Sequence, residues 1–341
     1  MTLATSSRIT GVRPLWAVEG GWLSIGGDGF PVEPLAEVRI GSSAARVVTA
    51  SKRELRVAVP SGLEGGRTPV RLESTPGETV FVEIGAPLAT GLHQVDNPVF
   101  DPDGNLFVTF SGSRGQQSPV SIYVVRPDGT REPFVSGLPN PTSMAFDPAG
   151  ELHVSSRFDG TVYRIDRDGS PRPVVTDLGV ACGIAFDADG VLFVGDRTGT
   201  ILRVEHGRAA TLATLPPSIA AFHLAFGLDG TLFVTGPTLG TRDCIYSLTP
   251  EGDVSVFYEG LGRPQGIGVD AAGRLYVADA LAGSGGLYRF PPAGGDPECL
   301  LSAGGLVGVA FGPGGSMVVA SPDTVYRLDA GIQGLLPFPR R

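Results

Sequence analysis

The side chains with the most chemical potential stand at one position of a repeated motif and beside it. Five residues before a recurrent turn position, the chain carries in order Asp96, Thr142, Cys182, Phe222, Gln265 and Val307. Polar neighbours of this position are His93, Asn97, Asn140, Ser143 and His223. Carboxylates, amides, hydroxyls and imidazoles of this kind can bind a small molecule, hold a hard cation or carry out acid–base chemistry.

A second polar set follows the apolar runs that come after each turn. It consists of Ser156-Arg157, Asp196-Arg197 and Asp279. Together the two sets give the candidate catalytic acids Asp96, Asp196 and Asp279. They also give the candidate ligand-binding residues, which are Asp96, Asn97, Thr142, Cys182, His223, Gln265, Arg157 and Arg197.

Each candidate also has a purely structural interpretation. Cys182 is either a small packing residue or a nucleophile with His223 as its base. Asp196 and Asp279 can bond nearby backbone amides at the starts of loops. For Arg157 and Arg197, pairing with local acids is favoured over binding a ligand. His153 is expected to be a partly buried strand residue.

The recurrent turn lies in six segments that share one pattern. They are FDPDGNLFV from Phe100, FDPAGELHV from Phe146, FDADGVLFV from Phe186, FGLDGTLFV from Phe226, VDAAGRLYV from Val269 and FGPGGSMVV from Phe311. Successive turn glycines are 40 to 46 residues apart. Two further apolar runs follow each pair of strands, and four strands per repeat of this length are typical of a propeller blade. The sequence therefore predicts a six-bladed β-propeller over residues 90–341.

The repeat also predicts where a site should be. The first strand of each blade runs to the turn and the second runs back, so the turns share one face, which we call the turn face. First-strand starts and second-strand ends share the opposite face, called the mouth face here. Because residues on the mouth face differ from blade to blade, we expect the site there. Two closures of the ring stay open: a last strand within Ile332–Phe338, or an N-terminal strand within Glu83–Leu92.

Residues 9–85 do not fit the repeat. Alternating strands and Gly-rich turns predict about seven short strands, which indicates an immunoglobulin-like β-sandwich. We expect it to be an independent domain, joined by a short linker near 85–91. The I-x-x-V-x-P start, the G-G-x-L-x-I-x-G-x-G-F hairpin and the V-P-x-G-L-x-G-G turn stand in order. With these motifs the segment resembles the TIG (IPT) domain, which implies an interaction or spacer module.

The propeller segment resembles NHL-repeat proteins and the gluconolactonase/luciferin-regenerating-enzyme family, most closely at PQGIGVDAAGRLYVAD, residues 264–279. The resemblance implies lactone hydrolysis with one divalent cation, such as Ca²⁺, at the mouth. The family's ligands are a first-blade Glu, middle-blade Asn residues and the Asp of a P-D-G motif. Here these places hold Asp96, then Thr142 and Cys182, then Gln265, so Asp96 is the one anionic metal ligand at the matching positions.

These substitutions lead to two hypotheses of function. The first is a non-catalytic propeller that binds a small molecule or a protein at a degenerate gluconolactonase-like mouth, with no cofactor. The second is a lactonase-type hydrolase with a divergent metal site. No H-E-x-x-H, G-x-S-x-G, Walker or dinucleotide motif stands in a supporting context.

Charge and composition narrow the partners. The net charge is −9 and the pI about 5.0, without a basic stripe, which argues against nucleic acid and anionic membrane surfaces as partners. No apolar stretch is long enough for a signal peptide or a membrane span. The three cysteines are far apart in sequence and suit reduced thiols. We therefore expect a cytoplasmic protein, or a secreted one if a leader has been removed.

Overall fold

The computed structural model describes residues 7–73, 79–116, 118–281 and 284–335. These residues confirm the predicted all-β class, with strands throughout and one short 3-10 turn, η1 (Pro313–Gly315). Within the described ranges, no helix is long and apolar enough to cross a membrane.

The first part of the chain forms two sheets around one core. Its strands are β1 (Arg8–Arg13), β2 (Trp16–Ala17), β3 (Trp22–Asp28), β4 (Val38–Ile40), β5 (Ser43–Ala45), β6 (Val47–Ala50), β7 (Glu54–Ala58), β8 (Gly66–Leu72) and β9 (Thr79–Ile84). One sheet has the order β1-β3-β7-β6, and the other contains β2-β9-β8-β4-β5. In β3 and β8, Leu23, Ile25, Val70 and Leu72 alternate with less buried residues and are fully buried in the shared core.

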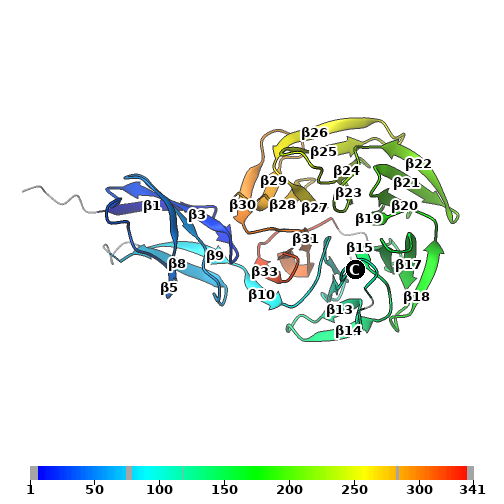
Figure 1. Ribbon diagram of the computed structural model, residues 1–341, viewed down its shortest axis with the longest axis horizontal. Coiled ribbons are helices and arrows are strands. Elements are labelled where there is room, and N and C mark those ends of the chain that lie inside the picture. The colour runs from blue at the N-terminus through cyan, green and yellow to red at the C-terminus, as the bar shows by residue number, and fades with distance from the viewer. Residues whose placement is uncertain (1–6, 74–78, 117, 282–283, 336–341) are drawn as a thin grey trace, which may run out of the picture.

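The rest of the chain forms a ring of sheets (Figure 1). Its strands are β10 (Ala86–Ala89), β11 (Val99–Phe100), β12 (Leu106–Thr109), β13 (Ile122–Val125), β14 (Arg131–Val135), β15 (Pro141–Phe146), β16 (Leu152–Ser156), β17 (Thr161–Ile165), β18 (Pro171–Val175), β19 (Ala181–Phe186), β20 (Leu192–Asp196), β21 (Thr200–Glu205), β22 (Arg208–Thr214), β23 (His223–Phe226), β24 (Leu232–Thr235), β25 (Asp243–Leu248), β26 (Val254–Leu261), β27 (Pro264–Val269), β28 (Leu275–Asp279), β29 (Gly286–Phe290), β30 (Glu298–Ser302), β31 (Gly308–Phe311), β32 (Ser316–Ala320) and β33 (Val325–Asp329).

Each of the first five predicted repeats gives four antiparallel strands in chain order. The groups β11–β14, β15–β18, β19–β22 and β23–β26 are separate sheets, and β27–β30 belong to a larger one. The last repeat supplies β31, β32 and β33, and β10 pairs with β33 as the fourth strand. Sheets set around a common centre in this way form a β-propeller. The N-terminal strand therefore closes the ring. The other candidate for the closing strand was Ile332–Phe338. Its described residues, 332–335, form an isolated bridge between Gly334 and Asp270. Residues from 336 on lie outside the described ranges.

The repeated turns have the geometry that their sequence predicts. In the second repeat the Gly150 N–H donates to Asp147 O at 2.9 Å, and the Glu151 N–H donates to Asp147 Oδ1 at 2.9 Å. Gly150 has a φ of +82° and Gly190 a φ of +81°, in the left-handed region that favours glycine. Asp147 therefore forms its hydrogen bonds within its own turn, which is the structural role that the sequence predicts.

The two parts of the chain are joined by a continuous sheet. Strand β2 pairs in parallel with both β30 and β9, which makes the β27–β30 group part of a nine-stranded sheet. The Trp22 N–H donates to Ser302 Oγ at 2.9 Å, and Tyr326 Oη donates to Glu19 Oε1 at 2.7 Å. The segment expected to be a linker contains β10 instead, because only Gly85 separates that strand from β9.

Candidate functional site

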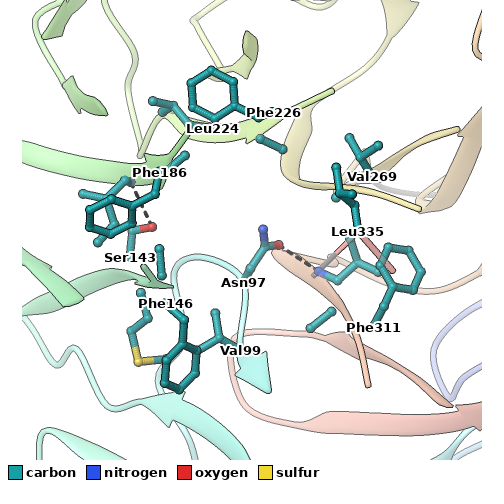
Figure 2. A pocket seen from close by; sticks show the side chains of 18 of the residues that line it. Asn97, Val99, Ser143, Phe146, Phe186, Leu224, Phe226, Val269, Phe311 and Leu335 are labelled. Atoms are coloured by element: carbon teal, nitrogen blue, oxygen red, sulfur yellow. Dashed lines mark hydrogen bonds between the residues drawn. The ribbon is translucent and has the colours of Figure 1, made fainter. Parts of the chain in front are cut away.

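A cavity of about 530 Å³ lies in the centre of the ring and is the candidate site. The first strand of every repeat contributes to its wall. Aromatic rings from five of the repeated motifs line it, namely Phe100, Phe146, Phe186, Phe226 and Phe311, with Val269 in the remaining repeat. Figure 2 shows the labelled members of this group around the cavity. We call this space the channel cavity. Its volume suits a drug-sized ligand, and apolar walls are usual for such sites.

The channel cavity reaches the turn face. Its lining includes the turn residues Asp187, Ala188, Gly227 and Leu228, and Leu228 is 60% exposed. Leu335, after the last strand, also lines it, and the Leu335 N–H donates to Val269 O at 2.9 Å. The cavity is therefore accessible from the side that carries the turns.

Polar groups lie at the other end of the cavity and form its floor. Asn97 bridges two neighbouring sheets: its Nδ2 donates to Ile267 O at 2.8 Å, and its Oδ1 accepts from the Val309 N–H at 2.9 Å. Ser143 Oγ accepts from the Ile184 N–H at 3.1 Å (Figure 2). Because these hydrogen bonds hold both side chains in place, the floor presents fixed polar groups beneath an apolar wall.

A buried acid–imidazole pair spans the ring at the floor. Asp96 precedes β11 in the first repeat and His223 begins β23 in the fourth, yet Asp96 Oδ1 lies 2.6 Å from His223 Nδ1. Asp96 is 3% exposed and His223 is fully buried. Asp96 Oδ1 also accepts from the Asn97 N–H at 2.7 Å, whereas His223 Nε2 has no hydrogen-bond partner. The carboxylate thus orients the imidazole and leaves one ring nitrogen unused.

The expected ring of mouth residues is closed rather than open. Thr142, Cys182, Phe222, Gln265 and Val307 are all less than a tenth exposed. Thr142 Oγ1 donates to Asn140 O at 3.1 Å, and Thr235 Oγ1 donates to Gln265 O at 2.5 Å. The burial of all five side chains indicates that they are packed against the surrounding loops and strands. The candidate cavity lies on the turn side of this ring, whereas the sequence predicted a site on the mouth face.

Burial also sets the chemistry of Cys182. It raises the pKa of this thiol to about 12, although Arg157 and Arg197 act in the opposite direction. A thiol that stays protonated at neutral pH is a poor nucleophile. His153 lies in β16, 5% exposed, with its ring edge-on to Phe186 at 4.8 Å, which is the strand environment that the sequence predicts.

The other two candidate acids bond backbone amides. Asp196 Oδ1 accepts from the Val180 N–H at 2.8 Å, and Asp279 Oδ1 accepts from the Arg263 N–H at 2.6 Å. Burial raises the pKa of Asp279. Neither residue lines the channel cavity. Both aspartates anchor the start of the first strand in their own repeats.

The two candidate arginines bond backbone carbonyls, whereas the sequence predicted local acids as their partners. Arg157 Nη2 donates to Gly112 O at 3.0 Å, and Arg197 Nη2 donates to Ile219 O at 2.6 Å. Both side chains reach across to the mouth-face loop of a neighbouring repeat, whose carbonyls are closer than any carboxylate. They do not line the channel cavity.

The residues at the family's metal positions do not fit a divalent cation. Asp96 Oδ1 is bonded to His223 Nδ1 and to the Asn97 N–H, Thr142 donates its hydroxyl to Asn140 O, and the raised pKa of Cys182 keeps its thiol protonated. Hard cations need several free oxygens directed at one point. Within the ranges that the structure describes, no cluster of three or more His, Cys, Asp or Glu side chains is arranged for a metal.

Sequence reasoning missed most of the cavity wall. Of the predicted ligand residues, Asp96 and Asn97 line the cavity, while Thr142, Cys182, His223 and Gln265 do not. The missed residues are the phenylalanines of the turn motif itself. Their recurrence was the available signal, since an aromatic residue at the same place in five first strands must gather at one end of the channel.

Comparison with known proteins defines the fold. No family model and no curated protein matches the sequence. A structure described as a putative gluconolactonase has a TM-score of 0.61 at 17% identity, over 74% of this chain and 93% of that one. The calcium-binding protein regucalcin from Agrobacterium tumefaciens has a TM-score of 0.59 at 17% identity, over 75% and 97% of the two chains. An auxiliary nutrient binding protein from Bacteroides thetaiotaomicron has a TM-score of 0.54 at 13% identity, over 94% and 97%.

At these identities the likeness shows the fold alone. The chain therefore has a β-propeller fold similar to the folds of these structures. The third structure aligns with both parts of the chain, whereas the first two cover about three quarters of it.

Proposed function

We propose that this protein is a six-bladed β-propeller that binds a small molecule in its channel cavity without transforming it. The observation that carries the proposal is the cavity of about 530 Å³, walled by phenylalanines and floored by Asn97 and Ser143. This composition favours a largely apolar ligand with one polar group directed at the floor. A protein partner that inserts an apolar side chain would use the same features.

The state of the floor supports a binding role over a catalytic one. Asn97 and Ser143 are already paired with backbone groups, and Asp96 is paired with His223, so few polar groups are free to polarise a substrate or activate water. The likeness to an auxiliary nutrient binding protein over both parts of the chain is in keeping with a binding function.

For the N-terminal part, we propose an immunoglobulin-like sandwich of the TIG/IPT type that serves as a docking module. Two sheets sharing one core, at residues 9–85, support this assignment. This part lies beside the ring and away from its centre (Figure 1), so it leaves the channel cavity uncovered. The acidic charge and the free cysteines support a cytoplasmic protein with no nucleic-acid or membrane partner.

The second candidate function is a lactonase-type hydrolase, favoured by the Asp96–His223 pair. An imidazole oriented by a carboxylate, with Nε2 unpartnered, is a general-base arrangement. The imidazole would take a proton from a water molecule that attacks the carbonyl of a lactone at the floor, and would return the proton to the ring oxygen as the C–O bond breaks. His223 is fully buried and does not line the channel cavity, so the hydrolase ranks below the binding function.

A titration followed by an assay separates the two functions. Metal-stripped protein is titrated with N-phenyl-1-naphthylamine, a neutral apolar fluorophore, and is then assayed with simple aldonolactones with and without Ca²⁺, Mg²⁺, Mn²⁺ or Zn²⁺. The binding function predicts saturable fluorescence enhancement and no lactone opening. Lactone opening, with or without added metal, that disappears in Asp96→Ala would establish the hydrolase instead.

A further inference from the structure

A group of basic side chains gathers on the mouth face, apart from the channel cavity. Its members, called the basic rim here, are Arg114, Arg157 and Arg197, together with His93 and Ser111. None of them lines the cavity. The protein carries a net charge of −9, yet in the described ranges none of the three arginines forms a salt bridge with a carboxylate.

Arg157 is the central member of the basic rim and is held firmly. Its Nη2 donates to Gly112 O at 3.0 Å, and its backbone N–H donates to Asn140 O at 3.3 Å. Its Nε is buried and has no hydrogen-bond partner. A guanidinium N–H that no protein group accepts is a place where an external acceptor can bind.

Two more unpartnered polar atoms belong to the same neighbourhood. Ser111 Oγ and His93 Nδ1 are both buried without a partner, and the Ser111 N–H donates to His93 O at 2.9 Å. Asn140 fixes the loop that carries them, since its Nδ2 donates to Ser111 O at 2.6 Å and its Oδ1 accepts from the Gly115 N–H at 2.7 Å. Groups that can donate hydrogen bonds are thus held ready on a preformed loop.

The electrostatics of the basic rim favour a negatively charged ligand. Burial lowers the pKa of Arg157, and the nearby Arg197 and Arg114 lower it further. Burial and the charge of Arg157 also lower the pKa of His93. Like charges held together without a counter-ion repel one another, and a bound anion would relieve the repulsion.

We propose that the basic rim is a binding site for an oxyanion group, a carboxylate or a phosphate, with Arg157 as its principal contact. The guanidinium fork matches the planar geometry of a carboxylate and also suits phosphate oxygens. Ser111 and the Nδ1–H tautomer of His93 supply further donors. This second site acts independently of the channel cavity.

Calorimetric titration of the intact protein with inorganic phosphate and with citrate, at low ionic strength, tests the proposal and separates the two anion classes. Arg157→Gln removes the central contact, Arg114→Ala removes an exposed one, and Arg208→Ala at the exposed start of β22 is the matched control. At least one of the two anions should bind saturably. Arg157→Gln should weaken that binding roughly tenfold or more and Arg114→Ala by a few fold, with Arg208→Ala unchanged.

Arg114→Ala keeps the test decisive if Arg157→Gln does not fold, because Arg114 is exposed. Binding of neither anion, or binding that Arg208→Ala weakens as much as Arg114→Ala does, would overturn the proposal. Unchanged naphthylamine binding in Arg114→Ala would show that the channel cavity is a separate site. Loss of naphthylamine binding in the same variant would contradict the claim of independence.

Discussion

The two ends of the propeller channel were built from different parts of the same repeat, and only one of them leaves space. At the turn end, nearly every repeat places the same phenylalanine, and the cavity lies between these rings. At the mouth end, the residues differ from repeat to repeat. Asp96, Thr142, Cys182 and His223 are buried there and bond to or pack against their neighbours, which closes the channel.

This difference teaches that variety in a repeat does not by itself mark a site. Six identical polar residues around an axis would repel or leave bonds unmade, so a sealed floor requires residues that complement one another. Identical aromatic residues meet no such difficulty. They keep similar distances around the axis and leave a hollow that a ligand can fill.

The largest effect should appear in the chemistry of Cys182 at the closed end. With a pKa of about 12 in place of the ordinary value of 9.0, its thiolate fraction at pH 8 is lower by roughly a thousandfold. Labelling the folded protein with iodoacetamide, with peptide mass spectrometry, should therefore modify Cys244 long before Cys182. The Cys182 rate should still be rising at the highest pH at which the protein stays folded, and urea-unfolded protein should react at all three cysteines. Fast labelling of Cys182 at pH 8 would mean that the mouth end is open.

The next effect concerns the pair that seals the floor. Asp96→Ala removes the partner of His223 Nδ1 and of the Asn97 N–H, both in a buried setting. The free energy of unfolding should fall by about 2–4 kcal/mol, measured by urea denaturation. Asp103→Ala, at an exposed turn position, is the control and should change it by less than about 0.5 kcal/mol. Equal stability of the two variants would contradict the claim that the Asp96–His223 pair stabilises the floor.

A smaller effect is expected at the turns that frame the open end. Gly150 has a φ of +82° and no atom near its missing Cβ, so Gly150→Val suffers from backbone strain rather than from crowding. The free energy of unfolding should fall by about 1–3 kcal/mol, with naphthylamine binding unchanged. Ala149→Val, at the neighbouring exposed position, controls for the added bulk. A wild-type melting temperature in Gly150→Val would refute the turn geometry.

Much of the fold could be predicted from the sequence, because its signals are local. The D-x-x-G turns need one aspartate and one positive-φ glycine within four residues, and Asp147 and Gly150 behave accordingly. Closure of the ring stayed open, since β10 and the segment from Ile332 carry similar apolar patterns. Pairing of β10 with β33 depends on contacts between residues more than 230 positions apart.

The site was harder to predict because it also depends on contacts between residues far apart in sequence. Asp96 and His223 are 127 residues apart in sequence, and nothing local tells that they meet across the ring. Arg157 and Arg197 were expected to find acids, but their reach brings them to the carbonyls of Gly112 and Ile219. Residue type and spacing identified the polar residues around the axis. The assembled ring determines which of these residues pair, and therefore where space for a ligand remains.

The most direct test of a ligand-binding open end is to fill it. Val99, which lines the cavity in β11, is replaced by tryptophan, and Val174→Trp on the outer strand β18, where the side chain is 40% exposed, serves as the control. Affinity for N-phenyl-1-naphthylamine is measured by fluorescence titration. The account predicts that Val99→Trp weakens binding at least about tenfold, because the indole occupies the ligand's volume, while Val174→Trp leaves it unchanged. Equal affinity in both variants and the wild type would contradict it.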